Sequence, residues 1–177
     1  MAEQTRTDHE AIIAVGIITV SDSSFRGERE DLGGPAIRET MLAAGAAVGA
    51  AMIVPDEVDQ IAAAITTMAD ERHLDLVLTT GGTGLSARDV TPQATLSVID
   101  YQVPGIAEAM RAYSLTKTPA AMTSRAVAGV RGHTLVVNLP GSPKGARECL
   151  EVLVPALPHA VNLLRGETGD HQRPAPA

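Results

Sequence analysis

The sequence of 177 residues predicts one α/β domain with three layers, in which helices cover both faces of a mostly parallel central sheet. Short apolar runs rich in Val and Ile alternate with segments whose apolar residues recur at helical spacing. Such runs are typical of strands buried on both faces, and their alternation with helices favours a parallel sheet. No repeat or linker divides the chain. We therefore predict a single domain over 1–177, with flexible tails at 1–10 and 167–177.

Apolar runs and helical spacing predict three strands and two helices in the first half of the chain. The apolar run at 11–20 predicts the first strand, and the polar stretch that follows to Gly34 predicts a long loop. Pro35 suits a first helical position and Gly45 a helix end. The segments behind them have clear patterns: a strand at 48–54, helical spacing at 58–69 and a strand at 74–80.

The second half predicts further helices and one more strand. Thr91 followed by Pro92 is a good helix start, and this helix is expected to reach Asp100. A helix at 104–115 and a strand at 134–139 follow. The segment 144–165 is helical in pattern, but two prolines predict a break within it, and these are Pro155 and Pro158.

Composition excludes several classes of function. The net charge is −7, aromatic residues make up 2% of the chain, and no run of Lys or Arg is present. Binding of long nucleic acids needs clustered positive charge, and stacking on bases needs aromatic rings. No apolar stretch reaches the length of a membrane span, and the first residues lack a signal-peptide pattern. We expect a cytoplasmic protein with neither nucleic-acid nor membrane partners.

The single cysteine, Cys149, excludes an intrachain disulfide and a cysteine-rich metal site. It lies in an apolar helical pattern, which favours a small buried hydrophobic residue over a reactive thiol.

Four strands of the predicted sheet end in polar or glycine-rich turns. These turns follow Val20, Val54, Thr80 and Leu139. In an open parallel sheet ligands bind outside the carboxyl ends of the strands, where the strand order switches. We therefore expect the four turns to meet in one crevice.

The turn after Thr80 is Gly81-Gly82-Thr83-Gly84. Its N–H groups can approach an anion because no Cβ stands in the way. The sequence matches neither the phosphate-binding loop with Gly-Lys-Ser/Thr nor the G-x-G-x-x-G dinucleotide motif. A plain tight turn is an equally good interpretation of these residues alone.

Two acids, Asp56 and Asp89, follow the second and third strands. Asp56 fits a helix N-cap and Asp89 a charge at a helix entry, and both are common roles. Because Mg²⁺ prefers carboxylate and phosphate oxygens, the pair also fits a magnesium site for phosphoryl or nucleotidyl transfer. Arg88 is placed to offset a carboxylate or to meet a phosphate.

Other polar residues fit phosphate binding or an ordinary surface position equally well. They are Ser21, Asp22, Ser114, Ser124, Arg125, Ser142 and Lys144. Ser142 and Lys144 belong to a Pro-Gly-Ser-Pro-Lys segment that is also typical of a rigid turn. The five histidines show no metal-ligand spacing, and no Ser–His–Asp triad is indicated.

These motifs, taken in order, closely resemble the MogA/MoaB family of molybdopterin-binding proteins. The ordered series is Thr19-Val20-Ser21-Asp22, Pro55-Asp56-Glu57, Thr80-Gly81-Gly82-Thr83-Gly84, Arg88-Asp89-Val90-Thr91-Pro92, Val103-Pro104-Gly105, Thr123-Ser124-Arg125, Ala128-Gly129-Val130-Arg131-Gly132 and Asn138-Leu139-Pro140-Gly141-Ser142-Pro143. The resemblance covers 12–166. It implies a molybdopterin adenylyltransferase that converts molybdopterin and MgATP to adenylyl-molybdopterin and pyrophosphate.

The resemblance also implies roles for individual residues. Asp56 corresponds to a catalytic acid that acts through Mg²⁺, Asp89 to its acidic partner, and Thr83 to the loop that holds the adenylate phosphate. The remaining positions correspond to cofactor binding: Gly81, Gly82, Gly84, Ser21, Asp22, Ser114, Ser124, Arg125, Ser142 and Lys144. A homotrimer is implied, with hexamers more frequent in the MoaB branch, and so is hand-over of the product to a molybdenum insertase.

Three alternatives remain open from the sequence. A molybdopterin carrier of the same fold would bind the pterin without catalysis. A scaffold would use the same fold as an interaction module. A dinucleotide-dependent dehydrogenase would need the motif that is absent here.

Overall fold

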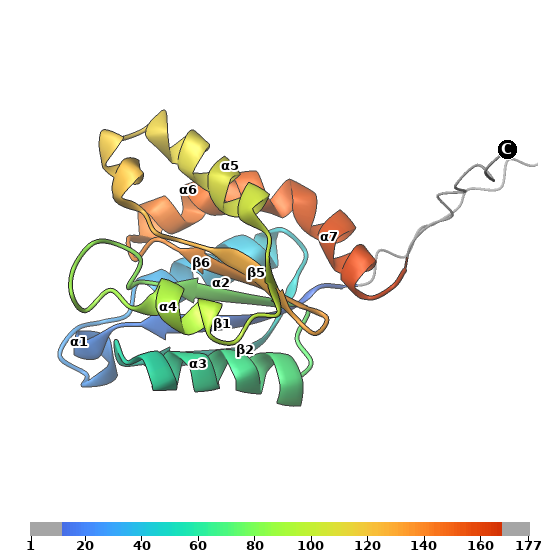
Figure 1. Ribbon diagram of the computed structural model, residues 1–177, viewed down its shortest axis with the longest axis horizontal. Helices are drawn as coiled ribbons and strands as arrows, with labels where there is room; N and C mark the ends of the chain where they lie inside the picture. Colours follow the sequence, from blue (N-terminus) through green and yellow to red (C-terminus); the bar gives the residue numbers. More distant parts are fainter. Residues whose placement is uncertain (1–11, 168–177) are drawn as a thin grey trace, which may run out of the picture.

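A computed structural model describes residues 12–167, which form a six-stranded sheet with the order β2-β1-β3-β6-β5-β4 (Figure 1). The strands are β1 (Ala14–Val20), β2 (Ala47–Val54), β3 (Leu76–Thr80), β4 (Tyr101–Gln102), β5 (Ala128–Arg131) and β6 (Thr134–Leu139). The strands β2, β1, β3 and β6 run parallel, while β4 and β5 are antiparallel at one edge. The predicted mostly parallel sheet is confirmed.

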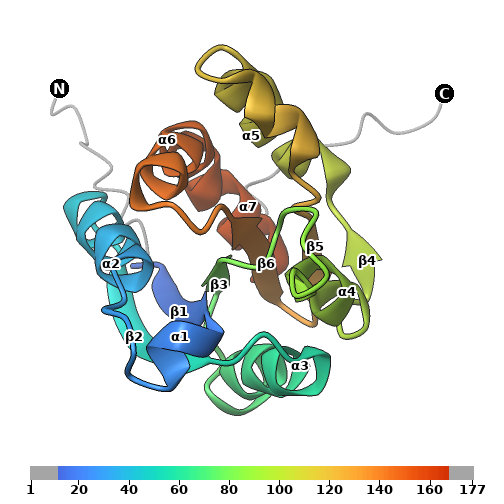
Figure 2. The same cartoon turned by 90° about the vertical axis from the view of Figure 1, so that its left-hand side faces the viewer.

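Helices cover both faces of this sheet (Figure 2). The helices are α1 (Asp22–Phe25), α2 (Gly33–Ala43), α3 (Val58–Thr66), α4 (Thr91–Leu96), α5 (Pro104–Leu115), α6 (Pro143–Leu153) and α7 (Leu157–Leu164). Three shorter segments are also helical. They are a π-helix at Thr67–Glu71 and 3-10 helices at Pro119–Thr123 and Val154–Ala156. The helices α2, α5, α6 and α7 pack on one face, and α3 and α4 on the other.

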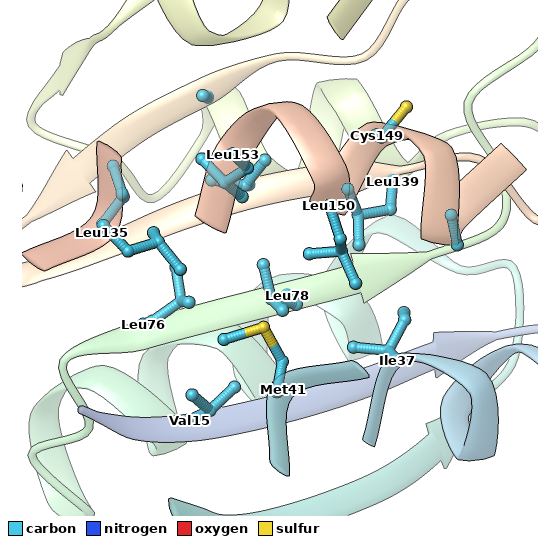
Figure 3. Close-up of a cluster of buried hydrophobic side chains, with 14 of the residues drawn as sticks. Val15, Ile37, Met41, Leu76, Leu78, Leu135, Leu139, Cys149, Leu150 and Leu153 are labelled. Carbon is cyan, nitrogen blue, oxygen red and sulfur yellow. The ribbon is translucent and has the colours of Figure 1, made fainter. Parts of the chain in front are cut away.

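The core consists of two aliphatic clusters, one on each face of the sheet. Figure 3 shows the first, in which Leu78 of β3 lies between Met41 of α2 and Leu150 of α6. The strands β1, β3 and β6 are buried almost throughout because helices cover both of their faces. Their continuous apolar runs in the sequence have this cause.

Several predicted elements are confirmed, while others differ at their ends. The proline-rich segment does interrupt the last helical region, at Val154–Ala156. Gly45 follows α2 with a φ of +83°, as expected for a residue that ends a helix. However, α2 begins at Gly33, so Pro35 is not its first residue. Asp31 explains the earlier start, because its Oδ1 accepts hydrogen bonds from the first two N–H groups of the helix.

Three further predictions need correction. The long loop at 21–34 contains the short helix α1, which Ser21 caps. The helix at Thr91 ends at Leu96 and does not reach Asp100. The strands β4 and β5 were not predicted, because two and four residues with a glycine among them carry too little periodicity. The predicted tails lie outside the described residues except for Glu167.

Within residues 12–167, no helix combines the length and the apolar character that crossing a bilayer requires.

Candidate functional site

The four strand-end turns meet at the carboxyl edge of the sheet, as predicted. The N–H of Ser21 donates to the carbonyl of Val54 (2.9 Å), which joins the ends of β1 and β2. The Thr80 hydroxyl donates to the Pro140 carbonyl (2.7 Å), and this bond joins β3 to β6. The chain leaves β1 for β2 on one side and returns to β3 on the other, so the strand order switches between β1 and β3. This is where an open α/β sheet is expected to bind its ligand.

The glycine loop, residues 81–84, lies at the centre of this edge. Gly81 has a φ of +102°, and a Cβ at this position would overlap the carbonyl oxygen of Val20. Gly82 has a φ of +63°, and a Cβ there would come within 3.3 Å of Asp56 Oδ1. On the far side, a Cβ at Gly84 would lie 2.9 Å from Asp89 Oδ2. The loop therefore needs glycine for both its conformation and its close contacts.

Asp56 is not a helix N-cap, contrary to the simpler of its two interpretations. The N-cap of α3 is Glu57, and Asp56 turns toward β1 instead. Its Oδ2 accepts the N–H of Asp22 (2.8 Å), and the Asp22 carboxylate accepts the N–H of Asp56 (3.0 Å). This reciprocal pair holds the two strand ends together. It leaves Asp56 Oδ1 without a hydrogen-bond donor among residues 12–167.

The two paired acids have opposite shifts in pKa. Burial raises the pKa of Asp56, and the neighbouring charge of Asp22 acts in the same direction. The backbone N–H of Asp56 lowers the pKa of Asp22, and the guanidinium of Arg88 also lowers it. The site therefore places a partly buried carboxyl next to a carboxylate that hydrogen bonds stabilise in its charged form, an arrangement found at many functional sites.

Asp89 lies on the other side of the glycine loop and does not cap α4. Its Oδ2 accepts the N–H of Ser86 (2.8 Å), while α4 has Val90 at its N-cap and no side-chain cap. Asp89 Oδ1 has no hydrogen-bond donor among the described residues. Asp56 and Asp89 thus each offer one carboxylate oxygen beside the loop, which fits an oxygen-liganded cation. No three His, Cys, Asp or Glu side chains within 12–167 are grouped to hold a metal.

One cavity, the α5 cavity, opens on the side of the loop that faces α5 and has a volume of about 240 Å³. Its wall is largely apolar, with hydroxyl groups spaced around it. Its lining includes Thr83, Gly84, Met110, Arg111, Ser114, Thr118, Ala121, Ser124, Ala126, Pro140, Ser142, Glu148 and Cys149. The predicted residues Thr83, Gly84, Ser114, Ser124 and Ser142 therefore share one cavity. Apolar walls with a few placed polar groups are typical of sites for small-molecule ligands.

A second cavity, the α1 cavity, lies over the switch between β1 and β3 and has a volume of about 400 Å³. Its lining is mostly polar, and it includes Thr19, Ser21, Ser24, Arg29, Glu30, Asp31, Gly33, Thr80, Gly81, Gly141 and Ser142. Ser142 thus lines both cavities, and its hydroxyl accepts the N–H of Gly145 at the start of α6 (3.1 Å). Of the predicted residues, Ser21, Gly81 and Ser142 line the α1 cavity, which adjoins the α5 cavity at Ser142.

Six predicted residues line neither cavity. Four of them, Asp22, Asp56, Gly82 and Asp89, lie at the glycine loop as described above, and the other two are Arg125 and Lys144. Arg125 lies behind the glycine loop, where its Nε donates to the Gly84 carbonyl (2.7 Å) and its Nη2 to the Asp89 carbonyl. Its backbone N–H also donates to the carbonyl of Thr83 (2.9 Å). Arg125 therefore fixes the loop. Lys144 is 86% exposed and lies 3.9 Å from Glu148.

Sequence reasoning missed Asp31 and Asn138. Asp31 lines the α1 cavity, and its Oδ2 accepts the Thr19 hydroxyl (2.8 Å). Asn138 lines the α5 cavity and is fully buried, where it donates to the hydroxyls of Thr79 (3.0 Å) and Thr95 (2.8 Å). An amide within the apolar run of β6 was the one available signal for Asn138, since buried polar side chains need partners.

Cys149 is buried, as predicted, and it forms part of the α5 cavity wall. Burial raises the pKa of its thiol, so less thiolate is present near neutral pH. We expect the folded protein to react with a disulfide reagent roughly tenfold or more slowly than the unfolded chain. A stopped-flow assay at pH 8 with and without guanidinium chloride measures both rates. Equal rates would show that the cavity wall opens freely.

Known proteins resemble this chain over most of its length. A family model described as "Probable molybdopterin binding domain" matches residues 16–159. A molybdopterin adenylyltransferase of Helicobacter pylori (strain J99) is 44% identical over 156 residues, which cover 87% of this chain and 89% of that protein. The molybdopterin adenylyltransferase of Escherichia coli K12 is 38% identical over 168 residues, with coverage of 87% and 86%. The crystal structure of the molybdopterin biosynthesis enzyme MoaB from Thermus thermophilus superposes with a TM-score of 0.83 at 55% identity, covering 88% of this chain and 98% of that one.

Proposed function

Because this chain belongs to the family of molybdopterin-binding domains, we propose that it catalyses the reaction for which its curated relatives are named, adenylyl transfer to molybdopterin. The substrates are ATP and molybdopterin, and the products are adenylyl-molybdopterin and pyrophosphate. One observation supports this proposal most directly. The glycine loop, residues 81–84, runs between two cavities and has Asp56 on one side and Asp89 on the other.

Each cavity fits one substrate by its chemistry. The apolar wall of the α5 cavity suits the flat pterin, and the hydroxyls of Ser114 and Ser124 can bond to its polar edge. The polar lining of the α1 cavity suits the nucleoside of ATP. The phosphates of both substrates then meet at the shared wall. There the N–H groups of the glycine loop and of the first turn of α6 can donate hydrogen bonds to them.

The reaction joins two anions. The terminal phosphate oxygen of molybdopterin forms a bond to the α-phosphorus of ATP, the bond from that phosphorus to the bridging oxygen breaks, and pyrophosphate leaves. In-line transfer of this kind depends on positioning and on neutralising negative charge. The loop N–H groups and the Thr83 hydroxyl position the phosphates, and Arg125 holds the loop in place.

Magnesium fits this site through the free Oδ1 atoms of Asp56 and Asp89. Bound there, it would offset the charge of the triphosphate and stabilise the leaving group. The chain's own acids would in turn fix the phosphates relative to the loop. No covalent intermediate on the protein is needed.

Pyrophosphate release from MgATP with purified molybdopterin tests the proposal. We expect release that depends on both substrates. A catalytically idle carrier, the main alternative, would bind the pterin tightly and release no pyrophosphate. That result would overturn the proposed activity and leave pterin binding as the function.

We expect Ser124→Ala to weaken molybdopterin binding roughly threefold to tenfold, because one neutral hydrogen bond contributes about 0.5–1.5 kcal/mol. The Ser124 hydroxyl lies in the α5 cavity and accepts the N–H of Ala126 at a long 3.3 Å, so its own proton is available to a ligand. Fluorescence titration with molybdopterin measures the change. Ser97→Ala is the control, since the Ser97 hydroxyl bonds to the Ala94 carbonyl in α4, away from both cavities. Equal Kd values for wild type and Ser124→Ala would remove Ser124 from the pterin site.

A homotrimer, a cytoplasmic location and hand-over of the product to a molybdenum insertase remain part of the proposal. They rest on the resemblance of the motifs. The edge strand β2 supports self-association, because Ala47, Gly49, Ala51 and Ile53 along it are exposed.

A further inference from the structure

The guanidinium of Arg88 lies between acids from two other strand ends. Its Nη2 is 2.8 Å from Asp22 Oδ2 and 3.0 Å from Glu57 Oε1, and its Nε is 3.1 Å from Asp22 Oδ2. Arg88 itself belongs to the segment that follows the glycine loop. One exposed side chain thus connects the ends of β1, β2 and β3 across the front of the site.

This contact accounts for much of the charge balance at the site. Asp22, Asp56, Glu57 and Asp89 bring four carboxyl groups to one edge of the sheet. Within residues 12–167, Arg88 is the one basic side chain that forms an ion pair with any of them. It occupies both oxygens of Asp22 (the contact to Oδ1 is 3.1 Å). With Arg88 in this position, Asp22 has no oxygen left for a metal ion.

A divalent cation held by Asp56 and Asp89 would lie beside the acids with which this guanidinium is paired. The two positive charges would repel each other at such short range. The described residues contain no ready group of three acids for a metal, and Asp22 and Glu57 share the guanidinium instead.

We propose that Arg88 is a built-in counter-ion, which neutralises Asp22 and Glu57 until a divalent cation arrives with the nucleotide and releases it. This inference rests on the proposed function for the origin of the cation. The resting site would then stay weak for free metal ions and gain affinity once phosphate oxygens add their ligands. Arg88 is in this sense a positioning residue, since it acts through Asp22 and Glu57.

Binding of Mn²⁺ alone, without ATP or pterin, tests the proposal. We expect Arg88→Gln to tighten Mn²⁺ binding roughly fivefold to tenfold, measured by electron paramagnetic resonance of the free ion, because a positive charge beside the site is removed. Arg88→Lys keeps the charge and should remain within about twofold of the wild type. Arg147→Gln is the matched control, because Arg147 is similarly exposed and pairs with Glu39 on α2, at 2.9 Å.

Each outcome has one meaning. Tighter binding in Arg88→Gln alone supports the exchange, and Asp56→Asn in the same background should remove the gain. Unchanged or weaker binding in Arg88→Gln, with a melting temperature like that of the wild type, would overturn it. The assay contains neither substrate, so its failure is separate from a failure to release pyrophosphate.

Discussion

Replacement of Asp56 by Asn should lower the rate of pyrophosphate release on the order of a hundredfold to a thousandfold. The change removes the negative charge beside Gly82 that would hold the cation against the triphosphate. The fold should survive, because an amide oxygen can still accept the Asp22 N–H that now lies 2.8 Å from the carboxylate. Burial already disfavours the charged form of Asp56 and raises its pKa, so a neutral isostere costs little stability.

The measurement is pyrophosphate release under saturating substrate, together with molybdopterin titration and thermal melting. Asp59→Asn is the matched control, because Asp59 lies three residues further on, is exposed and belongs to the first turn of α3. We expect Asp59→Asn to retain wild-type activity. Full activity in Asp56→Asn would show that the carboxylate serves only the pairing of β1 with β2, and the proposed metal site would be wrong.

Replacement of Gly81 by Ala should destabilise the protein by about 2–4 kcal/mol, which lowers the melting temperature by roughly 5–15 °C. Two costs add at this position. A φ of +102° is unfavourable for any residue with a Cβ, and the new methyl group would meet the backbone oxygen of Val20, which cannot rotate away. Because the Gly81 carbonyl also accepts the Thr91 hydroxyl (2.8 Å), the loop cannot shift without breaking that bond.

Variants at two other glycines distinguish the conformational cost from the steric cost. Gly45 has a φ of +83° and open space around it, so Gly45→Ala should cost about 1 kcal/mol from conformation alone. Gly105 lies in the first turn of α5 with open space, and Gly105→Ala should be neutral or stabilising by up to about 0.5 kcal/mol. Chemical denaturation of the three variants gives the order. A Gly81→Ala cost no larger than that of Gly45→Ala would mean that the contact with Val20 relaxes.

The sequence was sufficient to predict the parallel part of the sheet and the edge at which the site lies. Apolar runs identify β1, β3 and β6 because these strands are covered on both faces, and the rule for parallel sheets then brings their ends together. It was not sufficient for β5, where four residues that include Gly129 pair only through contacts made after folding. Short edge strands of this kind leave no periodic pattern.

The roles of some site side chains could be predicted, and those of others could not. The resemblance of the motifs predicted that Ser114 and Ser124 belong to one binding site, and the structure does bring them together with Thr83. The hydrogen bond from Arg125 to the Gly84 carbonyl could not be predicted from the sequence. A long flexible side chain bonds to whichever carbonyl the folded loop presents. Asp31 had no distinctive signal in a stretch already rich in charge, although its three hydrogen bonds begin α2 and anchor Thr19.

Main chain at Gly81 and Gly141 forms part of the wall between the two cavities. A Cβ at Gly141 would lie 3.2 Å from the Cα of Gly81, and Ser142 faces both sides. If a ligand in one cavity displaces this wall, the shape of the other cavity changes as well. Thermodynamic linkage then requires reciprocity: whatever factor the nucleotide contributes to pterin affinity, the pterin contributes to nucleotide affinity. A ligand that moves Gly81 or Gly141 would in this way couple the two cavities before any bond is made between their occupants.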